Sequence, residues 1–292
     1  MSVRLFEALQ RASSFLEKQN VEPGVAEVLL SHHTGWSRSR WLAELQTEME
    51  AASFEAFWND VERAGKGEPV QHITGVEQFY GREFRVSADV LIPRPETEEL
   101  VEGVLREIDA RYPDDRPLRI VDVGTGSGII AVSLAKELAG RRGAVRVDAV
   151  DISPAALETA RLNAQLLKVD VTFHLGDLLE PVIADGEPVD VVVSNPPYIP
   201  DCERENLAVN VREYDPAAAL FGGEDGLVLY RRLADQLPDV LREDGFAAFE
   251  IGFDQGETVP SLVQAAFGPE WRGRVEVQQD LNRNDRMLFV YR

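Results

Sequence analysis

The sequence predicts an α/β protein whose sheet has seven mostly parallel strands, the last of them antiparallel. Strand and helix patterns alternate from residue 118 onward, whereas the N-terminal part shows helical spacing alone, with a β-hairpin signal between the two. A chain of 292 residues is also too long for one compact core. We therefore expect a small helical domain over 1–70, a hairpin linker over 71–95 and an α/β domain over 96–292.

The apolar residues of the N-terminal segment recur at the spacing of amphipathic helices. Leu5, Leu9, Ala12 and Leu16, for example, fall on one helical face. No alternating strand pattern interrupts these stretches, so we expect short helices alone.

The linker combines a turn signal with a helix start. EQFY and EFRV flank Gly81, and a Gly-Xaa pair suits a tight turn between two short strands. In VLIPRP, Pro93 and Pro95 restrict the backbone around Arg94 to extended conformations. The glutamates that follow would lie in the first turn of a helix, where the helix dipole favours acids.

The C-terminal part supplies the sheet. Its seven strand candidates are LRIVDV, RVDAV, VTFH, VDVVVS, FAAFEI, RVEVQ and RMLFVY. Helical stretches near 129–138, 154–166, 226–242 and 256–267 separate most of them, which predicts a mainly parallel sheet wrapped by helices. Only LNRND joins the last two candidates, and this is too short for a crossover helix, so the seventh strand should be antiparallel.

A glycine-rich loop follows the first of these strands. In VDVGTGSG, Gly124, Gly126 and Gly128 let the chain turn sharply and let a ligand approach the backbone. Asp151 ends the second strand about 20 residues later, the spacing of an acid that binds ribose hydroxyls. If the loop binds no ligand, it is a plain turn between strand and helix. Asp122, just before the loop, would likewise be a simple cap at the end of its strand.

The spacing of the glycines argues against a dinucleotide. A dinucleotide fingerprint needs its third glycine at position 129, which here is Ile129. The G-x-G-x-G loop instead resembles that of S-adenosylmethionine-dependent methyltransferases.

The turn after the fourth strand carries the second motif, NPPY, formed by Asn195, Pro196, Pro197 and Tyr198. Two proline rings restrict its backbone, and Pro197 removes a donor. Ligands of open α/β sheets bind at the carboxyl ends of the strands, where this turn must lie. A rigid surface turn with an incidental tyrosine is the alternative.

The motif suits a planar nitrogen as methyl acceptor. The lone pair of an amide nitrogen is delocalised, as its rotation barrier of about 18–20 kcal/mol indicates. The Asn195 side-chain oxygen and the Pro196 carbonyl could each accept one N–H of an –NH₂ group, while Tyr198 stacks on it and excludes water. Such hydrogen bonds contribute about 0.5–1.5 kcal/mol each, whereas positioning contributes roughly 7–11 kcal/mol. Orientation should therefore be the larger effect.

Together, NPPY, VDVGTGSG and IPRPETEELVE resemble the HemK/PrmC family of release-factor glutamine methyltransferases. The resemblance covers most of residues 68–292. The N-terminal segment resembles that of the family only in its length and its helical type. It implies a Rossmann-like methyltransferase fold, S-adenosyl-L-methionine as cofactor, and class 1 peptide-chain release factors as substrates through the glutamine of Gly-Gly-Gln.

The resemblance also implies a set of site residues. The expected cofactor contacts are Gly124, Thr125, Gly126, Ser127, Gly128, Asp151, Leu178 and Asn195. The expected substrate contacts are Asn195, Pro196, Pro197 and Tyr198, of which Asn195, Pro196 and Tyr198 take part in catalysis. Family members often carry an aromatic residue where Leu178 follows Asp177, so adenine would here pack on an aliphatic side chain.

Other roles stay open at this stage. The N-terminal domain is expected to dock the substrate, with a stabilising cap as the alternative. Arg94 and Glu98 are interpreted as structural residues of the helix start, with a role in shaping the pocket or anchoring the N-terminal domain as the alternative.

Composition narrows the function classes. Thirty basic against 51 acidic residues give a net charge of −21, which disfavours a long nucleic-acid footprint. No apolar run reaches 18 residues and no signal peptide is evident, so we expect a cytoplasmic protein without membrane contact. We also expect a monomer that does not bind nucleic acid directly. The histidines lack metal spacing, and Cys202 has no partner for a disulfide. An adenine-specific nucleic-acid methyltransferase and a non-catalytic cofactor-binding scaffold are the alternative functions.

Overall fold

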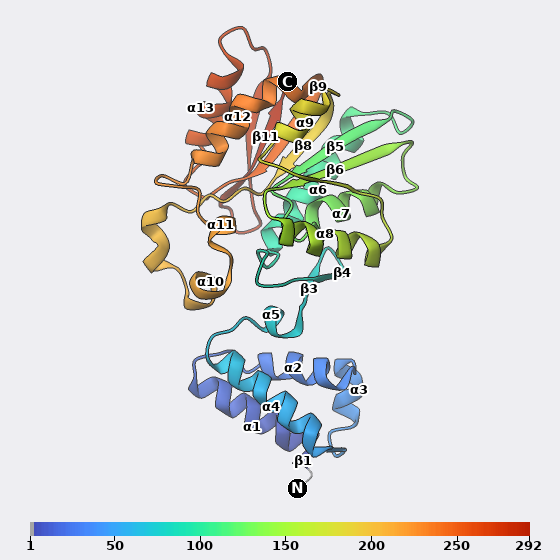
Figure 1. The fold of residues 1–292 in the computed structure, drawn as a ribbon, viewed down its shortest axis with the longest axis vertical. Coiled ribbons are helices and arrows are strands. Elements are labelled where there is room, and N and C mark those ends of the chain that lie inside the picture. Colours follow the sequence, from blue (N-terminus) through green and yellow to red (C-terminus); the bar gives the residue numbers. More distant parts are fainter. Residues whose placement is uncertain (1–2) are drawn as a thin grey trace. The chain divides into compact units, whose positions relative to one another are not determined.

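The computed structural model describes residues 3–292 (Figure 1). The chain divides into two compact units. The first comprises Met1–Val76 and Ala208–Tyr214, and the second Glu77–Leu207 and Asp215–Arg292. The first unit thus includes a short segment that lies far along the sequence. Within the described chain, no helix combines the length and the apolar character needed to span a membrane.

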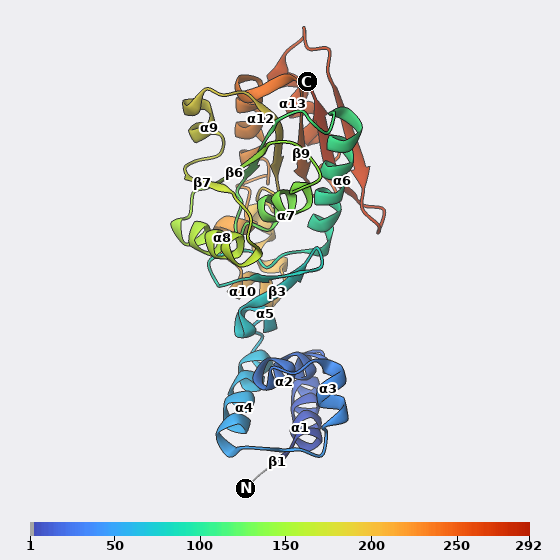
Figure 2. The ribbon, with the colours of Figure 1, turned by 90° about the vertical axis from the view of Figure 1, so that its right-hand side faces the viewer.

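The first unit is mainly helical. Its elements are β1 (Val3–Arg4), α1 (Leu5–Lys18), α2 (Val25–Thr34), α3 (Arg38–Ala43), β2 (Glu48–Met49), α4 (Ala51–Gly65), α5 (Val70–Thr74) and α10 (Val209–Tyr214). Helices α1, α2 and α4 pack on one another (Figure 2) around the fully buried Leu16, Leu29, Trp41 and Phe57. The strands β1 and β2 pair antiparallel, so the expectation of helices alone was wrong. Two residues per strand are too few to produce an alternating pattern.

The linker forms the predicted hairpin, with a different turn. Strands β3 (Val76–Phe79) and β4 (Arg82–Arg85) flank Tyr80 and Gly81, whose φ angles are 50° and 70°. Two positive φ values are typical of a type I′ turn, so glycine occupies its second central position rather than the first. The Tyr80 amide donates to Glu98 Oε1 at 2.6 Å, which ties the turn to the start of the next helix.

The second unit is the α/β unit. Its helices are α6 (Pro95–Arg111), α7 (Ile129–Leu138), α8 (Pro154–Leu167), α9 (Glu180–Asp185), α11 (Ala217–Leu220), α12 (Val228–Val240), α13 (Thr258–Phe267) and the 3₁₀ helix η1 (Asp201–Asn206). Its strands are β5 (Leu118–Val123), β6 (Val145–Asp151), β7 (Thr172–Leu175), β8 (Val189–Ser194), β9 (Leu241–Glu250), β10 (Arg274–Gln279) and β11 (Asp285–Tyr291).

The seven strands lie in the order β10-β11-β9-β8-β5-β6-β7. β5 to β9 run parallel, and β11 is antiparallel to both of its neighbours, as the short β10–β11 connection predicted. One buried cluster joins the sheet to α6, α7 and α8, and another joins its other face to α9, α12 and α13 (Figure 1). Every residue of β5 and β8 is buried, because helices cover both faces of these parallel strands.

Strand order places the ligand crevice. From β5 the chain proceeds outward to β6 and β7, and then returns to the other side of β5 to form β8. Such a reversal opens a crevice at the carboxyl ends of the strands, where the glycine loop, Asp151 and NPPY all lie.

A buried asparagine holds the glycine loop against the hairpin. Asn163 of α8 is fully buried, and its Oδ1 accepts a hydrogen bond from the Arg85 amide at 2.7 Å. Its Nδ2 donates to the carbonyls of Arg85 and Ser127, at 2.9 and 2.8 Å. One side chain therefore joins β4, α8 and the loop.

We predict that Asn163→Ala lowers the free energy of unfolding by about 2–4 kcal/mol, because it leaves the buried Ser127 carbonyl and two half-buried backbone groups of Arg85 without these partners. Urea denaturation measures the difference. Asn206→Ala, at an exposed position that bonds Glu203, should stay within about 0.5 kcal/mol of the wild type. Equal stability of the two variants would show that Asn163 does not hold these elements together.

Candidate active site

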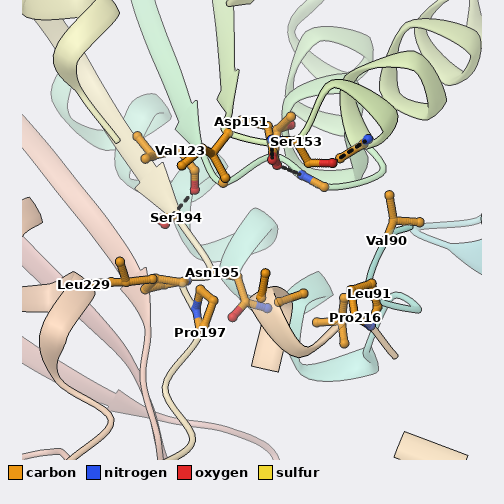
Figure 3. Close-up of a pocket in the computed structure, with 18 of the residues that line it drawn as sticks. Val90, Leu91, Val123, Asp151, Ser153, Ser194, Asn195, Pro197, Pro216 and Leu229 are labelled. Atoms are coloured by element: carbon orange, nitrogen blue, oxygen red, sulfur yellow. Dashed lines mark hydrogen bonds between the residues drawn. The ribbon is translucent and has the colours of Figure 1, made fainter. Parts of the chain in front are cut away.

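A cavity of about 390 Å³ opens at the carboxyl ends of the central strands (Figure 3). Its volume lies in the range of small-molecule sites. Nine of the predicted site residues line it: Gly124, Thr125, Gly126, Ser127, Asp151, Leu178, Asn195, Pro196 and Pro197. The cavity thus brings together residues at the carboxyl ends of four strands, β5, β6, β7 and β8.

The glycine loop leaves space for a ligand next to its backbone. Gly124 and Gly126 have φ angles of 70° and 55°, and a Cβ at either position would meet no protein atom within 4 Å. Because both residues line the cavity, such a Cβ would take up ligand space. Gly128 differs: it is absent from the cavity lining, and a Cβ there would lie 2.9 Å from the Cβ of Ala160. Its glycine is explained by close packing on α8, and its cofactor contact stays a prediction.

Asp151 is held in place by backbone donors. Its Oδ2 accepts from the Gly126 amide and its Oδ1 from the Ser153 amide, both at 2.8 Å. A carboxylate has about four acceptor positions, so the side chain keeps acceptors for two hydroxyl groups. Asp151 lies beside Ser153 (Figure 3), and both residues line the cavity.

The wall beside Asp151 is aliphatic. Leu178, with a φ of 49°, and Ile152, 66% exposed, both line the cavity and suit a planar ring. Sequence analysis missed Ile152, although it directly follows Asp151. It also missed Arg232, which lines the cavity and donates to Asp177 Oδ2 at 2.7 Å.

Asp122 supports the loop from inside the protein. It is fully buried, and its Oδ2 accepts from Thr125 Oγ1 at 2.6 Å and from the Ala131 amide at 3.1 Å. Burial raises the pKa of this carboxyl group to about 7, against the effect of the two hydrogen bonds. Asp122 therefore joins the end of β5 to the loop and to α7, which goes beyond a simple strand-end cap.

Within NPPY, the structure separates the tyrosine from the other three residues. Asn195, Pro196 and Pro197 line the cavity, whereas Tyr198 is not among its lining residues and packs against the core cluster that contains Tyr230. Burial raises the pKa of the Tyr198 hydroxyl to about 12, so this group is neutral near pH 7. Stacking of Tyr198 on a substrate stays a prediction.

The amide of Asn195 is bound from behind by two residues that sequence analysis did not identify. Asn195 Nδ2 donates to Thr97 Oγ1 at 3.1 Å, and Thr97 Oγ1 donates to Glu250 Oε2 at 2.7 Å. Thr97 and Glu250 are both buried. With Nδ2 engaged, the Oδ1 atom of Asn195 is the acceptor left for the cavity.

The two residues at the start of α6 have separate roles. Arg94 lines the cavity and forms an ion pair with the buried Asp215, with 2.8 Å between Nη2 and Oδ2. Glu98 instead holds the hairpin turn through the Tyr80 amide. Arg94 thus lies in the wall of the pocket, where sequence analysis favoured a purely structural role.

Known proteins resemble this chain over nearly its whole length. Residues 7–75 match the PrmC N-terminal domain, and residues 105–234 match the methyltransferase small domain. A release factor glutamine methyltransferase of Bacillus anthracis is 44% identical over 288 residues, which cover 99% of each chain. The chain belongs to the release factor glutamine methyltransferase family. Its relatives of the same description include those of Bacillus subtilis, 46% identical over 97% of this chain and 96% of that one, and of Enterococcus faecalis, 41% identical over 99% and 100%.

Solved structures agree on the fold of the family. A methyltransferase from Pyrococcus furiosus has a TM-score of 0.51 and 15% identity, covering 80% of this chain and 98% of that one. The 16S rRNA N2 G1207 methyltransferase of Thermus thermophilus has a TM-score of 0.50 and 16% identity, covering 74% and 49%. The predicted Rossmann-like methyltransferase fold is confirmed.

We predict that Asp151→Ala weakens binding of S-adenosyl-L-methionine at least tenfold. Each hydrogen bond from a ribose hydroxyl to a carboxylate contributes about 1.5–3 kcal/mol. Isothermal titration calorimetry measures the affinity, and Asp170→Ala, at an exposed position, is the matched control. Unchanged affinity in a folded Asp151→Ala variant would remove Asp151 from the cofactor site.

Proposed function

We propose that the chain methylates the side-chain amide nitrogen of the glutamine in the Gly-Gly-Gln motif of class 1 peptide-chain release factors. The observation that carries this proposal is the Asn195 amide, bound to Thr97 through its nitrogen and left with its oxygen for the cavity. An oxygen acceptor there suits a substrate –NH₂ group. The names of the full-length relatives support the substrate class.

The cofactor of the proposed reaction is S-adenosyl-L-methionine, which supplies an electrophilic methyl group on a sulfonium. The glycine loop and Asp151 would hold it, because they leave backbone-lined space and free carboxylate acceptors. Leu178 and Ile152 would contact its adenine. The nitrogen lone pair of the glutamine forms the new bond to carbon, and the electrons of the broken carbon–sulfur bond stay on sulfur. The methylated nitrogen then releases one proton to water.

The residues of NPPY orient the nitrogen. The Asn195 Oδ1 atom and the Pro196 carbonyl accept the two N–H bonds, which directs the lone pair toward the methyl group. These bonds contribute about 0.5–1.5 kcal/mol each, and positioning of the two reactants contributes roughly 7–11 kcal/mol. Pro197 shapes the turn, and Tyr198 would stack on the planar amide.

The proposal assigns substrate docking to the N-terminal unit. Its core cluster is distinct from those of the α/β unit, and none of its described residues, 3–76 and 208–214, lines the cavity. It can therefore bind a folded release factor without taking part in the chemistry. The enzyme would act as a monomer in the cytoplasm, where release factors meet the ribosome, without binding nucleic acid directly.

We predict that Asn195→Ala lowers kcat by about 10²–10³, because it removes one preorganised acceptor at the reacting nitrogen. Its affinity for the cofactor should change little. Transfer of labelled methyl groups is measured with a release factor, with the same factor after substitution of the Gly-Gly-Gln glutamine, and with duplex DNA. Only the first should be labelled, and Asn206→Ala should behave as the wild type.

Two results would contradict parts of this account. Labelling of DNA, or equal labelling of the glutamine-free factor, would overturn the substrate. Full activity of Asn195→Ala on the release factor would keep the substrate and exclude the proposed role of the amide.

We also predict that a chain beginning near Pro69 binds the cofactor as the full chain does but methylates an intact release factor less efficiently. Loss of docking should appear mainly as a higher KM. Cofactor affinity, measured by calorimetry, shows whether the shortened chain is folded. A shortened chain that binds the cofactor and keeps the full kcat/KM would exclude the docking role.

A further inference from the structure

The amide of Asn195 has two ends of nearly the same shape and opposite hydrogen-bonding character. Its oxygen accepts hydrogen bonds and its –NH₂ group donates them. A substrate amide that presents N–H bonds needs the oxygen. Rotation of the Asn195 amide by 180° would set two donors against each other, so some feature of the protein must fix its orientation.

We propose that Thr97 and Glu250 are positioning residues that decide which end of the Asn195 amide faces the substrate. This inference rests on the proposed function, since it concerns the same reaction. Both residues lie far from NPPY in the sequence: Thr97 is in the first turn of α6, and Glu250 is the last residue of β9. The fold brings both behind Asn195.

The direction of the hydrogen bonds follows from the charge on Glu250. An ionised carboxylate can only accept, so the single hydroxyl proton of Thr97 points to Glu250 Oε2. Thr97 Oγ1 then has only lone pairs to offer Asn195, and it must receive the –NH₂ end. The Asn195 side chain also lowers the pKa of Glu250, as expected when its –NH₂ end is turned toward that carboxylate. The oxygen of Asn195 is thereby left for the substrate.

A protonated Glu250 would remove this constraint. Its hydroxyl could donate to Thr97, and the Thr97 proton would then be free to point at Asn195. That arrangement favours the oxygen of Asn195 facing Thr97 and the –NH₂ group facing the cavity. The substrate N–H bonds would meet donors, and the reacting nitrogen would lose its orientation.

The surroundings of Glu250 make its charge sensitive to pH. Burial raises the pKa of this carboxyl group to about 7, although the Thr97 hydrogen bond and the charge of Arg286 on β11 act against it. The other titratable groups that face it are Glu96 on α6, Tyr198 after β8 and Tyr230 on α12. A bound sulfonium adds positive charge and favours the carboxylate. Activity should therefore rise with pH through a step at or below about 7.

The test compares Glu250→Gln, Thr97→Val and Thr97→Ser with Glu243→Gln, an exposed glutamate at the start of β9. For each variant, kcat and KM on a release factor are measured from pH 5.5 to 8.5, and cofactor affinity is measured by calorimetry. We expect kcat at pH 8 to fall about tenfold or more in Glu250→Gln and Thr97→Val. The cofactor Kd should stay within about threefold, and the rise of kcat with pH should disappear.

The controls separate positioning from structural damage. Thr97→Ser keeps the hydroxyl and should recover most of the activity and the pH step, and Glu243→Gln should match the wild type. If Glu250→Gln fails to bind the cofactor, the comparison of Thr97→Ser with Thr97→Val tests the inference instead. High activity of the serine variant with low activity of the valine variant supports it, and equal activity of the two variants overturns it. A wild-type kcat and pH step in Glu250→Gln also overturns it. A wild-type chain that does not methylate the glutamine would instead refute the proposed function itself.

Discussion

The substrate side of the site depends on one chain of hydrogen bonds: Asn195 donates to Thr97, and Thr97 donates to the buried Glu250. Each member comes from a different part of the chain, so the turn after β8, the start of α6 and the end of β9 must all be in place before the Asn195 oxygen faces the cavity. Buried polar groups in such a chain reinforce one another when every partner is present, and they are costly when one is missing. The rigid turn of NPPY and the packed helices on both faces of the sheet keep every partner in position.

The two halves of the pocket use different physics. On the cofactor side, backbone geometry dominates: positive φ angles at Gly124 and Gly126 leave open space, and backbone amides hold Asp151. On the substrate side, side-chain polarity dominates, because the buried carboxylate of Glu250 fixes the hydrogen bonds of Thr97 and Asn195. The topology joins the halves, because the chain reverses direction around β5 and brings the two loops to one crevice.

Much of the fold could be predicted because its signals are local. LRIVDV and VDVVVS are continuous apolar runs, as buried parallel strands require, and the short LNRND connection decided the direction of β11. The glycine loop and NPPY were equally visible. Thr97 and Glu250 were not, since 153 positions separate them and neither belongs to a local pattern. The hairpin turn was predicted, but the positive φ of Tyr80 within it was not, because this conformation of a tyrosine depends on its tertiary contact with Glu98.

The orientation of the Asn195 amide can be observed directly by neutron diffraction from crystals of the complex with S-adenosylhomocysteine and a Gly-Gly-Gln peptide. We predict that Asn195 Oδ1 lies about 3 Å from the glutamine nitrogen. Both deuterons of its –ND₂ group should point away from the peptide, one of them to Thr97. An –ND₂ group that faces the peptide, or a glutamine bound away from NPPY, would contradict it.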